Sequence, residues 1–270
     1  MHVLSMALTL LHIAGAGDDP VPAGLRCLQA AYPEAVAGVT PTSLTLTDGT
    51  VIPWDDGREK DLAARLADPD LQDQMVTPYP AGADWIGPPA EGQDPGRARH
   101  DGFFRGVYGA TRREVEEKSV VVRWMPETTK KMVRITTVGG VHEKVRAISD
   151  ALDRLPKHLR KFVAEPSSFH WRTIKGTDRL STHSFAIAID VGVEISNYWR
   201  WDLREGVSGI PKWRSKIPME IVGIFEHHGF IWGGKWSHYD TMHFEYRPEL
   251  LHPLCAGDAV PQTLDGMWLD

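Results

Sequence analysis

The chain has 270 residues, of which 42% are hydrophobic, and this is enough for one substantial core with a smaller accessory region beside it. Lys and Arg number 30 against 36 Asp and Glu, a formal net charge of −6, so no basic excess favours nucleic acid as a partner. The 10 Trp residues are many for this length, and clustered Trp side chains either pack a core or wall a binding pocket.

The first 16 residues have the pattern of a signal peptide. An apolar run over 3–13 is followed by Ala14-Gly15-Ala16, a cleavage site of the A-x-A type. No Lys or Arg precedes the run, so a buried amino-terminal helix is the alternative. No later stretch approaches the roughly 20 apolar residues that a membrane-spanning helix needs. We therefore expect residues 1–16 to be removed, leaving an exported protein, periplasmic or secreted, with no stable membrane span.

Two cysteines, Cys27 and Cys255, lie near opposite ends of the chain. In an exported protein they can form one disulfide, which closes a long loop and contributes roughly 4 kcal/mol on the chain-entropy model. Two unrelated buried thiols are the alternative. Neither cysteine lies near the residues that carry chemistry, so neither is predicted to be a nucleophile.

The amino-terminal part of the chain is predicted to be a small α/β region. Helical periodicity over 25–32 and 58–75 flanks a hairpin, whose strands 43–47 and 50–52 meet at an Asp-Gly turn. Residues 77–96 are dense in Pro and Gly, which marks an irregular linker. We therefore predict an accessory region over 17–100, a catalytic domain over 101–252 and a carboxy-terminal tail over 253–270.

The second part of the chain carries strand and helix patterns in turn, which favours an α+β domain. The predicted strands are 119–124, 131–136, 169–171, 186–193 and 242–246. The predicted helices are 112–117, 141–163 with an interruption at Pro156, and 218–229, which begins at Pro218.

Two short motifs carry residues that bind metals. The first, over 181–190, places His183 and Asp190 at a turn and a following strand. The second, over 236–245, places Asp240 three residues before His243 on a strand-like run. Two imidazoles, one ligating carboxylate and one spare carboxylate are the complement of an open catalytic zinc site with three protein ligands. A structural zinc site usually has four ligands including Cys, so the absence of Cys from both motifs favours the catalytic kind.

These motifs resemble those of the zinc D-alanyl-D-alanine carboxypeptidases and L-alanyl-D-glutamate endopeptidases, a family that includes the vancomycin-resistance dipeptidases. The signature SxHxxGxAxD, followed by DxxH or ExxH, is carried here within residues 165–252. The resemblance implies that His183, Asp190 and His243 bind Zn²⁺ and that Asp240 is the general base. It also implies an α+β fold with a mainly antiparallel sheet and flanking helices, shared with the hedgehog signalling domain.

The chemistry of such a site follows from the metal. Zinc lowers the pKa of bound water toward about 7 and polarises the scissile carbonyl, while a carboxylate, here Asp240, moves the proton to the leaving amine. An oxyanion also needs a positive partner. Arg172 is the nearest basic residue before the first motif, where the family also has an Arg, and Arg179 is the alternative. Ala186 stands where the family pattern has Gly, which costs on the order of 1 kcal/mol if the position needs a positive φ.

Several further residues are expected to support the site. Trp236 and His238 are predicted to bind substrate, and a hydrogen-bonded structural role is the alternative for His238. Glu245 is expected to orient a metal ligand, and Ser181 to cap its turn. Other aromatic residues either line the groove or fill the core, namely Tyr198, Trp199, Trp201 and Trp232.

The resemblance implies a peptidase that acts on the stem peptides of peptidoglycan. Hydrolysis of a D-alanyl-D-alanine bond by a carboxypeptidase is the preferred reading, and hydrolysis of the L-alanyl-D-glutamate bond by an endopeptidase is the alternative. A function of another class, a peptidoglycan-binding module without catalysis, would need the base to be lost. The presence of Asp240 favours the enzyme.

Overall fold

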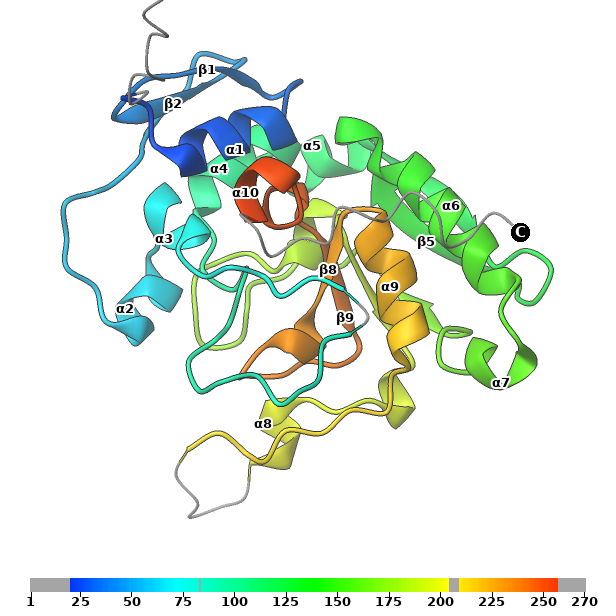
Figure 1. Cartoon of the computed structure of the whole chain (residues 1–270). Helices are drawn as coiled ribbons and strands as arrows, with labels where there is room; N and C mark the ends of the chain where they lie inside the picture. The colour runs from blue at the N-terminus through cyan, green and yellow to red at the C-terminus, as the bar shows by residue number, and fades with distance from the viewer. Residues whose placement is uncertain (1–19, 83, 204–208, 257–270) are drawn as a thin grey trace, which may run out of the picture.

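The computed structural model describes residues 20–82, 84–203 and 209–256, which form an α+β fold with antiparallel sheets (Figure 1). This confirms the predicted fold class. The predicted signal peptide and most of the predicted tail lie outside the described residues. No helix within the described ranges is long and apolar enough to cross a membrane.

The amino-terminal region contains the predicted helix and hairpin. Helix α1 (Ala23–Ala31) is followed by a sheet of β1 (Val36–Val39), β2 (Ser43–Leu46) and β3 (Val51–Pro53). The hairpin turns at Asp48 and Gly49, where the Asp48 side chain accepts from the Thr50 N–H at 2.8 Å and Gly49 has a φ of 88°. Strand β1 was not predicted.

The single helix predicted over 58–75 is wrong. The structure has two short helices, α2 (Leu62–Ala67) and α3 (Leu71–Met75). Asp70 separates them, because its side chain caps α3 by accepting from the Asp73 N–H at 2.7 Å. A cap requires a non-helical backbone, so the helical pattern cannot continue through this residue. Residues 77–96 contain no helix or strand where they are described, as the linker pattern predicted.

The middle of the chain builds a second sheet with helices beside it. Strands β4 (Ser119–Trp124) and β5 (Lys131–Thr136) pair as predicted, and α6 (Val141–Asp153) packs against both. Pro156 ends this run, and α7 (Lys157–Arg160) begins after it. The remaining helices here are α4 (Asp101–Tyr108), which was not predicted, and α5 (Arg112–Glu117), which was.

The third sheet has the strand order β6-β7-β9-β8 and is wholly antiparallel. Its strands are β6 (Pro166–Ser167), β7 (Ala188–Val191), β9 (His243–Tyr246) and β8 (Phe230–Trp232). The strand predicted at 169–171 is wrong, because this segment bonds to the turn before β7 instead of to a ladder. The His170 N–H donates to the His183 carbonyl at 3.3 Å, and the Arg172 N–H donates to Ser184 Oγ at 2.9 Å.

Strand β7 begins two residues later than predicted. The 3-10 turn η2 (Thr182–Phe185) comes first, and Ala186 then adopts a left-handed conformation with φ 55° and ψ 35°. The remaining helical segments are α8 (Trp199–Asp202), α9 (Met219–His227), α10 (Pro253–Ala256), η1 (Val138–Gly140), η3 (Val193–Ile195), η4 (Gly233–Lys235) and η5 (Pro248–Leu250).

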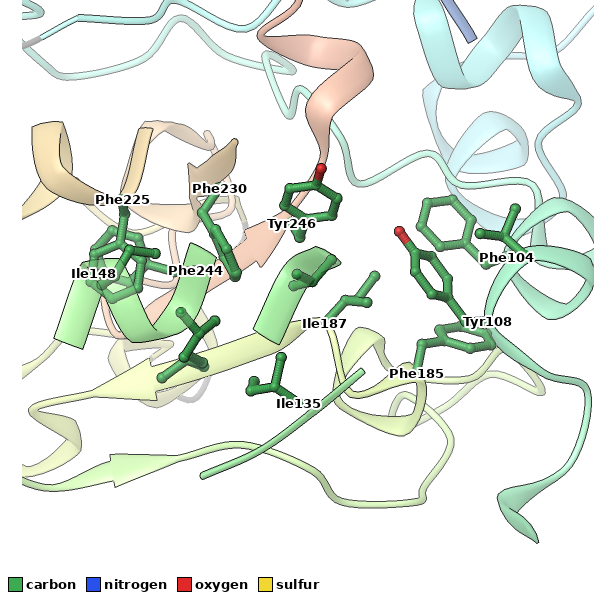
Figure 2. Close-up of a cluster of buried hydrophobic side chains, with 14 of the residues drawn as sticks. Phe104, Tyr108, Ile135, Ile148, Phe185, Ile187, Phe225, Phe230, Phe244 and Tyr246 are labelled. Atoms are coloured by element: carbon green, nitrogen blue, oxygen red, sulfur yellow. The ribbon is translucent and has the colours of Figure 1, made fainter. Parts of the chain in front are cut away.

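One cluster of buried side chains joins the helices and the three sheets (Figure 2). Phe225 of α9 stacks on Phe244 of β9 with ring centroids 3.9 Å apart, and each buried Phe contributes roughly 1.5–3 kcal/mol relative to an exposed one. The cluster includes Leu25 of α1 as well as the central strands, so it crosses the boundary predicted near residue 100. Cys27 and Cys255 form a disulfide with a Cα–Cα distance of 5.4 Å, which ties α1 to α10 (Figure 1).

Candidate metal centre

The three predicted metal ligands meet because of the register of the third sheet. Asp190 on β7 lies directly opposite His243 on β9, so both side chains leave the sheet at the same place. His183 lies in η2, immediately before β7, and the left-handed Ala186 turns the chain from that helix into the strand. The pairing of β7 with β9 thus joins Asp190 and His243 across 53 positions, and the turn before β7 adds His183.

The ligand atoms of this triad are close enough to share one ion. Asp190 Oδ1 lies 3.1 Å from His183 Nε2 and 2.9 Å from His243 Nδ1, and the two nitrogens are 3.3 Å apart. Zinc bonds of about 2.0–2.1 Å in tetrahedral geometry separate neighbouring ligand atoms by about 3.3–3.4 Å. Two imidazoles and one carboxylate are also ligands that zinc accepts. The residues present therefore fit a zinc ion.

The second nitrogen of each imidazole is held by the protein. His183 Nδ1 lies 2.6 Å from the Ser168 carbonyl, which can accept its proton. His243 Nε2 lies 3.0 Å from Glu245 Oε2. These contacts fix the tautomers, so that Nε2 of His183 and Nδ1 of His243 face the centre. Glu245 orients a predicted ligand, as expected from the sequence.

The charges of the triad favour a proton or a cation at its centre. Burial alone would lower the pKa of His243, but hydrogen bonds to Asp190 and Glu245 raise it to about 10. Burial would likewise raise the pKa of Asp190, but His183 and His243 hold it well below its usual range. The carboxylate is therefore ionised at neutral pH, and the imidazole of His243 is protonated until a metal displaces the proton.

Asp240 supplies a carboxylate that the protein leaves unpaired. Its Oδ1 is buried and has no hydrogen-bond partner among the described residues. Burial raises its pKa to about 6, although His243 acts in the opposite direction. A group of this kind can accept and release a proton near neutral pH.

A cavity of about 340 Å³ connects the triad, Asp240 and the predicted substrate residues. Arg172, Trp236 and His238 all line it, as does the alternative arginine, Arg179. The Arg179 guanidinium is held by backbone carbonyls, including that of Arg99 at 3.0 Å. Arg172 is exposed and free to reach a substrate. The full set of arginines that line the cavity is Arg97, Arg99, Arg172, Arg179 and Arg200.

The aromatic residues divide between the cavity and the core. Tyr198 and Trp199 line the cavity, whereas Trp232 is buried in the hydrophobic cluster and Trp201 is exposed. Ser181 lines the cavity too and is the N-cap residue of η2, but its side chain makes no cap hydrogen bond. Its backbone carbonyl accepts from the Ser184 N–H at 2.9 Å instead.

The structure adds two residues that the sequence did not indicate. Asp94 accepts from the His238 backbone N–H at 2.8 Å, and its second oxygen lies 2.7 Å from His238 Nδ1. Arg97 lies over the ring of Trp236, with Cζ 5.1 Å from the centroid. Asp94 lies in the Pro/Gly-rich segment 77–96 and Arg97 directly follows it, where no periodicity relates a residue to a distant site. His238 therefore combines a hydrogen-bonded structural role with a place on the cavity wall.

Fold and site together bring three residues that could hold a metal ion, and one unpaired carboxylate, to a cavity beside an antiparallel sheet. Residues 175–246 match the sequence model of a peptidase family described as D-alanyl-D-alanine carboxypeptidase. The match supports a peptidase of that family and covers the two motifs, while residues 20–174 lie outside it. Comparisons with curated proteins and with solved structures gave no match.

Proposed function

We propose that the chain is a zinc-dependent peptidase that hydrolyses the D-alanyl-D-alanine bond of peptidoglycan stem peptides. One observation carries the proposal: three ligand atoms from His183, Asp190 and His243 converge beside the unpaired carboxylate of Asp240 in one cavity. A structural metal centre would need neither an unpaired carboxylate nor a cavity beside its ligands. The description of the matched family supports the choice of bond.

The residues of the chain divide the chemistry between them. When bound, zinc supplies Lewis-acid polarisation of the scissile carbonyl and lowers the pKa of the attacking water. Asp240 accepts the proton of that water and transfers it to the leaving nitrogen, a task that suits a carboxyl group with a pKa of about 6. Arg172, exposed at the cavity, donates hydrogen bonds to the carbonyl oxygen as negative charge develops on it.

The site is also compatible with the L-alanyl-D-glutamate bond, because the same groups act on either amide. Export would place the enzyme outside the cytoplasm, where peptidoglycan lies. We therefore include removal of residues 1–16 in the proposal. Sequencing the amino terminus of the protein recovered from outside expressing cells should show a chain that begins near residue 17, and a retained Met1 there would contradict this part.

Mass spectrometry of digested peptidoglycan tests the activity and names the bond. The purified protein should bind about one zinc ion, as expected for one site of three protein ligands, and release D-alanine from stem pentapeptides. His183→Ala, Asp240→Ala and chelation should each abolish the release. Release at the wild-type rate in all three cases would refute the mechanism. Tight binding of peptidoglycan without turnover would instead indicate a binding module.

A further inference from the structure

Arg97 combines a guanidinium that makes one hydrogen bond with a position beside a candidate metal ligand. Its Nη1 donates to the His238 carbonyl at 3.3 Å, and no other acceptor lies within hydrogen-bonding distance of its side chain among the described residues. It lies over Trp236, whose ring centroid is 5.6 Å from that of His243. Its charge also attracts the carboxylate of Asp240. Most of its N–H donors therefore remain available beside the reacting groups.

The other arginines of the cavity are engaged differently. Arg99 is buried, donates to the Leu180 carbonyl at 2.9 Å and lies 3.8 Å from Glu245. Arg179 donates to backbone carbonyls. Arg200 is exposed, where it donates to the Lys175 carbonyl at 3.2 Å. Arg200 makes as few hydrogen bonds as Arg97, but it lies over Trp199. Arg97 lies over Trp236, the ring next to His243, so besides Arg172 it is the available arginine placed beside the candidate metal ligands.

The segment that carries Arg97 is fixed to the second motif by several hydrogen bonds. Asp94 is buried and holds both the backbone N–H and the ring of His238. The Ser237 N–H donates to the Gln93 carbonyl at 2.8 Å, and Trp236 Nε1 donates to the Pro95 carbonyl at 2.6 Å. A guanidinium held on such a frame is preorganised for a planar partner.

Both bonds considered for this enzyme share one feature on the leaving side. The carbon that carries the leaving nitrogen also carries an ionised carboxyl group. In D-alanyl-D-alanine this group is the terminal carboxyl. In L-alanyl-D-glutamate, where the next residue is joined to the γ-carboxyl of the glutamate, it is the α-carboxyl. A carboxylate is the planar two-oxygen partner that arginine binds bidentately.

Resting on the proposed function, we propose that Arg97 binds this carboxylate on the leaving residue and so selects peptides in which it is free rather than amidated. The amino-terminal region thereby supplies a specificity-determining residue to the site, although it lies outside the segment that matches the peptidase family.

Paired substrates test the inference. The first pair is a diacetylated L-Lys-D-Ala-D-Ala peptide with a free or an amidated terminus, and the second is an L-Ala-γ-D-Glu-L-Lys peptide with a free or an amidated α-carboxyl. For the bond that the wild type cleaves, kcat/KM should be about 10- to 100-fold higher for the acid than for the amide, the range for a hydrogen-bonded charge. Arg97→Gln should lower the acid rate by that factor and leave the amide rate within about twofold.

Two further variants sharpen the result. Arg97→Lys keeps the charge but not the planar fork, so its acid-to-amide ratio should be intermediate. Arg113→Gln, at an exposed arginine of α5 that does not line the cavity, should keep the wild-type ratio. Both rates are measured on the same preparation of each variant. The acid-to-amide ratio therefore does not depend on the fraction of the protein that is folded.

An unchanged acid-to-amide ratio in Arg97→Gln would overturn the inference while leaving the proposed function standing. A wild-type enzyme that cleaves the acid and the amide equally would do the same. A zinc-loaded wild type that cleaves none of the four peptides would refute the proposed function and the inference with it.

Discussion

Glu245 holds His243 by its outer nitrogen, with Oε2 3.0 Å from Nε2, so that Nδ1 faces Asp190. The other carboxylate oxygen of Glu245 accepts from Arg247 Nη1 at 3.0 Å, and Arg247 Nε donates to Glu249 Oε1 at 2.6 Å. A wholly buried chain of alternating charges therefore stands behind the metal centre. It fixes the ring before any metal arrives.

Glu245→Gln should weaken zinc binding about 10- to 100-fold, because the amide is a weaker acceptor for the imidazole N–H than the carboxylate. Competition with a chromophoric chelator measures this affinity. Glu220→Gln, at an exposed position of α9, is the matched control and should bind zinc like the wild type. Equal affinities in the two variants would show that Glu245 does not tune the ligand.

The residues of the candidate metal centre could be picked out from the sequence because each motif is local. His183 and Asp190 lie on one turn and strand, and Asp240 and His243 on another, so residue type and spacing identify both pairs. Their meeting depends on the pairing of β7 with β9, which the sequence does not state by itself but the family resemblance implies.

The remaining wall of the cavity could not be predicted, because its contacts are distant and non-periodic. Asp94 binds His238 across 144 positions from a segment without helix or strand. The helix predicted over 58–75 fails for a local reason instead, because the Asp70 side chain caps α3 and all its partners lie within 14 positions of it. Lys60 Nζ lies 3.0 Å from Asp70, and the Asp56 N–H also donates to it, so this residue is anchored outside the helical path.

Asp240→Asn should lower kcat by about 10²- to 10⁴-fold, the usual contribution of a general base, while zinc content stays unchanged. Asp240 must be ionised to accept a proton, so wild-type activity should fall as the pH drops through its pKa. Burial raises that pKa to about 6, and a bound cation lowers it, which puts the midpoint at or below about 6. A pH profile of kcat/KM with metal analysis measures both effects.

Asp150→Asn, at an exposed position of α6, is the control for the loss of one carboxylate and should retain full activity. Substantial turnover by Asp240→Asn, with the acid limb of the profile preserved, would assign the base to another group.

Zinc binding should release about one proton from His243 at neutral pH, because its pKa in the metal-free chain is raised to about 10. Apparent affinity should then rise about tenfold per pH unit below that value. The raised pKa also stabilises the metal-free protein fully below about pH 6.5, with loss as the pH rises toward about 10. Titration calorimetry in buffers of different protonation enthalpy counts the proton, and identical heats in all buffers would contradict the assignment.

Ala186→Val should destabilise the protein by at least about 3 kcal/mol. A β-branched residue is strongly disfavoured at φ 55°, and the site is fully buried, so added methyl groups also overpack it. Ala186→Gly should stay within about 1 kcal/mol of the wild type, because relief of the left-handed strain offsets the lost methyl group and the added chain entropy.

Urea unfolding measures these differences, and Ala188→Val is the matched control. Ala188 is equally buried two residues later, but on the extended backbone of β7, which suits a β-branched side chain. A loss at position 186 no larger than that at 188 would mean that the left-handed backbone is not the cause.

Loss of the Cys27–Cys255 disulfide should lower the free energy of unfolding by about 2–5 kcal/mol, since it closes a loop of 228 residues in the unfolded chain. The expected result for Cys27→Ser with Cys255→Ser is a lower Tm that no longer depends on reductant, whereas the wild-type Tm should fall in reductant. Mass spectrometry before and after alkylation checks the bond directly. Two alkylated thiols in the unreduced protein, with a Tm equal to that of the double variant, would show that the cysteines are not joined.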